Sequence, residues 1–160
     1  MFDYIFGLPM HALVIHAVVV FVPLTSLAAV GYAVRPGWRR VLRWPTVVGA
    51  VISGGSAFVA AESGEQLLRR VSAVRASTTD FGLLAQHQEW GDRARTVCLV
   101  FMVLALALVW FARPPGEQAP GPRALDTALS VLVVVAAAAA TTTVVLAGHA
   151  GSAAVWHGLA

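Results

Sequence analysis

The fold is decided by one stretch near the amino terminus, Gly7-Leu8-Pro9-Met10-His11-Ala12-Leu13-Val14-Ile15-His16, which opens an apolar run ending near Val34. A helix needs about 20 apolar residues to cross the hydrocarbon core of a bilayer, and this run is long enough. Two histidines lie inside it, where an imidazole costs free energy unless something binds or hydrogen-bonds it. The stretch therefore predicts a membrane-spanning helix that carries a functional site.

Three further segments have the same apolar character. The 160-residue chain is 58% hydrophobic and only 12% charged, about half the charge of an ordinary soluble domain. We therefore expect an all-α, polytopic membrane protein, folded as an antiparallel bundle of four transmembrane helices in a single domain over residues 1–160. The predicted spans are roughly 10–34, 44–70, 81–112 and 124–149.

All of the positive charge is carried by arginine, eleven residues in total with no lysine. The arginines are scattered, which favours contacts with anionic lipid head groups and argues against nucleic acid as a partner. The densest short cluster lies in the first connection, at Arg35, Arg39, Arg40 and Arg43. Because cytoplasmic loops are enriched in arginine, we expect this connection inside the cell and both termini outside. Beyond the lipid bilayer, respiratory or other redox membrane proteins and a homo-oligomer are the partners left open.

Polar residues gather at one end of the expected bundle. In an up-and-down bundle, the first and third helices start beside the ends of the second and fourth. This threading brings one group of side chains to the outer end, with a member from every helix: His11, His16, Glu65, His87 and His149. Four-helix scaffolds build metal and cofactor sites from such inward-facing ligands.

Two classes of function follow from this cluster. In the first, it binds haem b for electron transfer, with one axial ligand from His11 or His16 and the other from His87 or His149. A close variant is a transition metal, iron, copper or zinc, held by these histidines and Glu65. In the second class, the protein is a non-catalytic accessory subunit or small transporter whose cluster is a proton- or ion-handling network. No hydrolase, nucleotide-binding or P-loop motif is present, and enzymatic activity is left open.

Simpler interpretations compete with a shared site. His11 and His16 are about 140° apart around a helix, so both cannot face one centre. His87 could belong to a solvated helix start, and Glu65 could pair with Arg69 on the same helix. The sequence shows no internal repeat of useful strength.

Four motifs are similar to those of a known family: Gly7-Leu8-Pro9-x-His11-x-Leu13-Val14-Ile15-His16, Ser63-Gly64-Glu65, His87-x-x-x-Gly91 and Gly148-His149-x-Gly151-x-x-Ala154-Val155-Trp156. On these motifs the chain resembles the actinobacterial branch of domain-of-unknown-function family 2231, small bacterial four-helix membrane proteins. In the broader family, the first motif often has His-Pro where this chain has His11-Ala12. The resemblance implies a bacterial cytoplasmic membrane and motif roles for the histidines and Glu65, but it names no ligand. Some relatives occur beside cytochrome-like or iron–sulfur modules, which favours redox chemistry by analogy.

Overall fold

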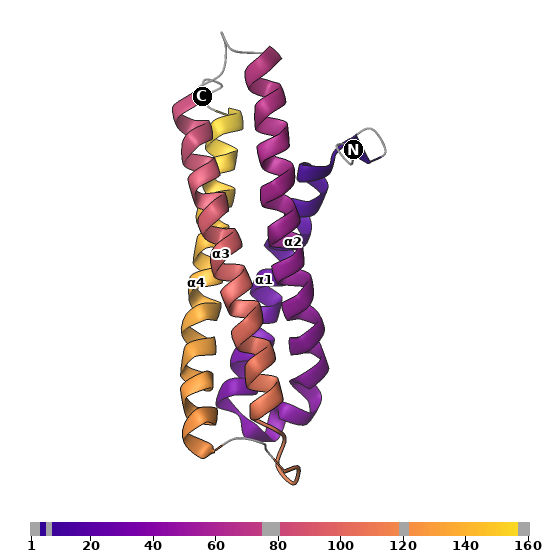
Figure 1. Ribbon diagram of the computed structural model, residues 1–160, viewed down its shortest axis with the longest axis vertical. Helices are drawn as coiled ribbons and strands as arrows, with labels where there is room; N and C mark the ends of the chain where they lie inside the picture. The colour runs from indigo at the N-terminus through magenta and orange to yellow at the C-terminus, as the bar shows by residue number, and fades with distance from the viewer. Residues whose placement is uncertain (1–3, 6–7, 75–80, 119–121, 157–160) are drawn as a thin grey trace.

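Four long helices run up and down as a bundle in the computed structural model, which describes residues 4–5, 8–74, 81–118 and 122–156 (Figure 1). All four helices are long and apolar enough to cross a membrane, which confirms the predicted all-α fold. Two short strands pair antiparallel before the first helix, and a 3-10 helix joins the first two long helices. The elements are β1 Tyr4–Ile5, β2 Leu8–Pro9, α1 Met10–Val34, η1 Pro36–Trp38, α2 Arg39–Val74, α3 Phe81–Phe111 and α4 Arg123–Trp156.

Helices that are neighbours in sequence are neighbours in space. α1 packs on α2, α2 on α3 and α3 on α4, while α4 closes the ring against α1. α1 and α3 therefore lie on one diagonal of the bundle, and α2 and α4 lie on the other. The starts of α1 and α3 share one end with the ends of α2 and α4 (Figure 1). We call this end the histidine end, because it carries His11 and His87, and the opposite end the arginine end, because it carries Arg39.

The core is built mainly from small side chains, with a few large ones such as Tyr32 and Phe101, while most of the exposed surface is covered by large apolar side chains. Alanine dominates the buried residues, whereas Leu27 and Val41 are 71% and 75% exposed. In a bilayer, small residues let helix backbones approach closely and large apolar residues face the lipid. The distribution is that of a membrane protein.

Three helix boundaries differ by several residues from the predicted spans. α2 begins at Arg39 rather than near residue 44, because η1 leads directly into it, and Pro45 therefore lies inside the helix. α2 also ends at Val74 rather than near residue 70. α4 continues through Gly148 and Gly151 to Trp156 instead of ending near residue 149. Glycine has low helix propensity, but Gly151 packs against the His87 ring, and such tertiary contact overrides the propensity.

An ion pair ties the arginine end together. The guanidinium of Arg39 donates two hydrogen bonds to the Asp126 carboxylate, at 2.9 and 2.7 Å, and a third to the carbonyl of Tyr32 at 3.2 Å. The Tyr32 hydroxyl donates to the carbonyl of Ala112, just after α3, at 2.6 Å. The network joins α1, α2, α4 and the end of α3. The expected contact with lipid head groups is wrong for Arg39, which is only 5% exposed, because Asp126 lies within its reach across the bundle.

The structure contains an internal repeat that the sequence does not reveal. Most positions that α1 buries are buried on α3 76 residues later, and most positions that α2 buries are buried on α4 87 residues later. The buried equivalents on α1 and α3 are Val18 and Ala94, Val22 and Cys98, Ala29 and Ala105, Tyr32 and Leu108, and Ala33 and Val109. Those on α2 and α4 are Thr46 and Val133, Ala50 and Ala137, Ser53 and Ala140, and Ala57 and Val144.

Contacts between the two helical hairpins follow the same repeat. Gly54 of α2 lies against Met102 of α3, and at the equivalent positions Thr141 of α4 donates a hydrogen bond to Ser26 of α1 at 3.2 Å. Equivalent helices run in the same direction on opposite corners of the bundle. The two hairpins are therefore related by an approximate two-fold axis along the bundle.

Candidate bis-histidine site

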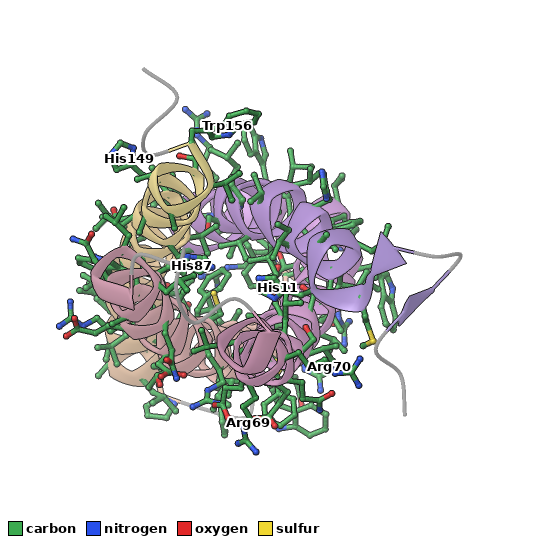
Figure 2. All side chains as sticks on the ribbon, turned by 90° about the horizontal axis from the view of Figure 1, so that it is seen from above. His11, Arg69, Arg70, His87, His149 and Trp156 are labelled. Atoms are coloured by element: carbon green, nitrogen blue, oxygen red, sulfur yellow. The ribbon has the colours of Figure 1, made fainter. Side chains whose placement is uncertain are left out.

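Two histidines from diagonally opposite helices meet at the histidine end. His11 lies in the first turn of α1 and His87 in α3. Their ring centroids are 6.1 Å apart, and the ring planes are inclined at 76°. Figure 2 looks down the bundle and shows both side chains between the four helices. His87 is the residue that the repeat makes equivalent to His11, so the pair lies on the approximate two-fold axis.

Each imidazole is fixed by a backbone carbonyl of the neighbouring helix. Nδ1 of His11 lies 2.8 Å from the carbonyl oxygen of Ala60 on α2, and Nδ1 of His87 lies 3.0 Å from that of Ala147 on α4. A carbonyl oxygen only accepts hydrogen bonds, so Nδ1 of each ring is the protonated nitrogen. In the neutral side chains, each Nε2 therefore carries a free lone pair. Among the described residues, no hydrogen bond reaches either Nε2.

Each ring also rests on a glycine of the helix that holds it. A Cβ built on Gly64 would lie 3.0 Å from Cε1 of His11, and one built on Gly151 would lie 2.9 Å from Cε1 of His87. Real Cβ atoms essentially never come as close as the contact at Gly151, and the contact at Gly64 is tighter than nine in ten real Cβ contacts, so an alanine at either position requires the ring to shift. Each glycine lies four residues, one helical turn, after the residue whose carbonyl accepts the hydrogen bond from the ring. The two halves of the site are thus built alike, as Ala60 with Gly64 and Ala147 with Gly151.

The other two histidines predicted for the site lie away from the pair. His16 is exposed, and its Nδ1 donates to the carbonyl of Ala12 in its own helix, at 2.6 Å. His149 is exposed on α4 and lies on the outer side of that helix in Figure 2. The two histidines of α1 were expected to point in different directions, and the structure shows that His11 faces the axis of the bundle and His16 does not.

The carboxylates of α2 pair with arginines rather than with imidazoles. Glu65 lies 3.5 Å from Arg69 of its own helix, as the simpler interpretation proposed, and Glu62 lies 3.2 Å from Arg95 of α3. Nowhere in the described ranges do three or more His, Cys, Asp or Glu side chains come together as metal ligands. The expected convergence of one ligand from each helix is not found there. The structure brings together two imidazoles.

The comparisons with known proteins place this chain in a family. A family model described as "Predicted membrane protein (DUF2231)" matches residues 7–159. The chain belongs to the DUF2231 family. No curated protein and no solved structure matches it. This DUF2231 protein is an integral membrane protein with four candidate spans; its assignment to the actinobacterial branch stays a prediction.

The chemistry that the DUF2231 site offers is that of two imidazole nitrogen donors. Among the described residues, no ion pair or hydrogen bond joins a carboxylate to either ring. A hydrogen bond from Nδ1–H to a carbonyl fixes the tautomer and orientation of metal-bound histidines and raises their basicity. The pair therefore has the ligand type and the supporting contact of a bis-imidazole site.

Sequence reasoning found both histidines of the pair but missed the groups that position them. The carbonyls of Ala60 and Ala147 carry no side-chain signal. Gly64 and Gly151 belong to recognised motifs, and a signal was available in the repeated spacing Ala-x-x-x-Gly near the end of each even-numbered helix.

Proposed function

We propose that the His11–His87 pair is the ligand set of a redox centre, a haem b or a single transition-metal ion, and that the protein carries electrons in a bacterial cytoplasmic membrane. The observation that carries the proposal is the pair itself: two imidazoles on opposite helices, each with Nδ1 bonded to a carbonyl and Nε2 free. Ionisable side chains that face the interior of a membrane bundle are rare and costly, and they commonly mark a functional site.

The number of protein ligands favours haem b over the metals bound by protein side chains alone. A structural zinc ion takes four ligands from the protein, and catalytic zinc takes three, whereas the described residues supply two at this site. Haem iron needs only two axial ligands, because the porphyrin provides the other four. A copper ion in linear two-fold coordination is the remaining alternative among the metals considered.

The spacing of the rings also suits a shared metal. Imidazoles bound on opposite sides of one ion, with metal–nitrogen distances of about 2 Å, have ring centres roughly 6 Å apart. The observed separation is 6.1 Å. Small residues surround the pair, among them Ala60, Ser63 and Gly64 on α2.

An optical spectrum of the purified protein in detergent, together with elemental analysis, tests the proposal. We expect a Soret band that shifts on reduction by dithionite, and its loss in both His11→Ala and His87→Ala. His16→Ala and His149→Ala are the matched controls, since both side chains are exposed, and they should retain the band. Stoichiometric metal without a Soret band would support the non-haem centre.

A colourless, metal-free protein would contradict the proposal, provided that it was produced with haem and metals supplied. The pair would then be a hydrogen-bonded link between helices, as in an accessory subunit.

The arginine distribution supports a position for this centre on the outer face of the membrane, with both termini outside. A membrane-impermeant thiol reagent tests the orientation in a Cys98→Ser background. It should label Ser152→Cys but not Gly37→Cys in intact cells, and the reverse pattern would contradict the orientation.

A further inference from the structure

The two-fold repeat makes a specific statement about the candidate site. His11 and His87 are equivalent, and so are the groups that hold them: Ala60 and Ala147, and Gly64 and Gly151. Each half of the site is built by one helical hairpin, α1 with α2 for His11 and α3 with α4 for His87. The two imidazoles are therefore presented in the same way by the two halves of the chain, from opposite sides of the axis.

We infer that Gly64 and Gly151 are a matched pair of positioning residues, which set the near-perpendicular ring planes of two equivalent axial ligands. This inference rests on the proposed function. The ring planes are inclined at 76°, and each ring is held between one carbonyl and one glycine. A hydrogen bond fixes the position of Nδ1, and the bare Cα of the glycine leaves room for the edge formed by Nδ1 and Cε1.

Adding a methyl group at either glycine acts on one ring only. The methyl carbon at position 64 would lie 3.0 and 3.1 Å from Cε1 and Nδ1 of His11, and at position 151 it would lie 2.9 and 3.0 Å from the same atoms of His87. The affected ring has to shift by a few tenths of an ångström or more. We expect it to turn about its Nδ1–H hydrogen bond, which changes the angle between the two ring planes while both Nε2 donors remain present.

Two other glycines provide matched controls. A Cβ at Gly55 of α2 or at Gly148 of α4 would meet nothing within 4 Å. Gly55→Ala and Gly148→Ala therefore add the same methyl group to the same two helices without touching an imidazole.

The electron paramagnetic resonance spectrum of the ferric protein measures the ring angle. Low-spin haem with nearly perpendicular imidazole planes gives a strongly anisotropic signal with a large highest g value, and rotation toward parallel planes lowers it. We expect the strongly anisotropic signal in the parent, in Gly55→Ala and in Gly148→Ala. Gly64→Ala and Gly151→Ala should each shift it while the haem content stays near that of the parent. If both variants keep the haem and the parental signal, the glycines do not position the ligands, although the proposed function stands.

A second measurement decides the inference in protein without haem, where the proposed function would have failed. Nitrogen NMR of ¹⁵N-histidine-labelled protein reports the Nδ1–H hydrogen bond of each ring. We expect Gly64→Ala to perturb the resonances of His11 alone and Gly151→Ala those of His87 alone, with neither control changing either ring. Parental spectra in both variants would overturn the positioning role. Because each half of the site has its own variant, a folding failure of one leaves the other decisive.

Discussion

Asp126 and Arg39 have a side-chain environment unlike that of the other charged residues. Arg39 is buried, and its guanidinium donates hydrogen bonds to both carboxylate oxygens of Asp126 and to the carbonyl of Tyr32. Breaking a buried ion pair by removing one charge is destabilising, because the remaining charge stays buried without a partner. The pair should therefore matter far more than the exposed ion pairs of the loops.

Asp126→Asn should lower the free energy of unfolding by about 2 kcal/mol or more, which is below the roughly 3–5 kcal/mol of fully buried pairs because Asp126 is partly accessible. Denaturant unfolding in detergent measures the change. Glu117→Gln is the matched control: Glu117 faces Arg43 and Arg113 at 3.6 and 3.9 Å and is exposed. Its substitution should change the free energy by no more than about 1 kcal/mol. Equal effects of the two substitutions would show that the Arg39–Asp126 pair has no special role.

For single residues, the sequence predicted which end of the bundle a side chain lies at better than it predicted which other side chains it contacts. The position of His11 and His87 near one end followed from helix length alone. Whether each pointed inward depended on the rotation of its helix, which the apolar sequence of α1 does not fix, because almost every position there is hydrophobic. For the same reason Arg39 could not be told apart from its neighbour Arg40, which is exposed.

Close approach between α1 and α2 depends on glycine. A Cβ at Gly49 would lie 2.4 Å from Oγ1 of Thr25, and this hydroxyl accepts a hydrogen bond from Ser53 at 3.1 Å. Removing side-chain bulk at such a crossing lets the two backbones pack directly, which is how membrane helices associate. Among the small residues of α2, Gly49 serves this packing.

Gly49→Ala should destabilise the protein by roughly 1–3 kcal/mol, since overpacking in a tight core forces the backbones or Thr25 to move. Gly55→Ala, on the lipid-facing side of the same helix, should be neutral or slightly stabilising, because alanine has the higher helix propensity. Thermal unfolding of both variants in one detergent makes the comparison. A Gly49→Ala protein as stable as Gly55→Ala would mean that α1 and α2 do not need the close contact.

The approximate two-fold axis is a property of the whole molecule. His11 and His87 meet across it at one end, and the equivalent residues Arg39 and Asp126 meet across it at the other. Two copies of one hairpin would place identical charges opposite each other at position 39 and its equivalent. A single chain avoids this repulsion, because its two halves can carry opposite charges at the equivalent positions, here Arg39 and Asp126.

The axis predicts that the ion pair can be reversed. Arg39→Asp and Asp126→Arg should each cost about 2–4 kcal/mol, because each loses the pair and places like charges face to face in a buried site. The double variant restores opposite charges at equivalent positions, and we expect it to recover more than half of the combined loss. Unfolding of the four proteins gives the coupling energy as a double-mutant cycle. Simple addition of the two losses would contradict the equivalence of the two positions.

Amino-acid order by itself determined the number of helices, their approximate limits and their alternating direction, because hydrocarbon thickness and polar interruptions leave few other solutions. It also determined that His11 and His87 lie at the same end. Only the tertiary structure decided which side chains face the axis, that His16, His149 and the carboxylates of α2 lie apart from the pair, and that the two hairpins repeat. Burial on a helix in lipid depends on contacts with its neighbours, and a chain that is apolar on nearly every face does not encode those contacts in a readable pattern.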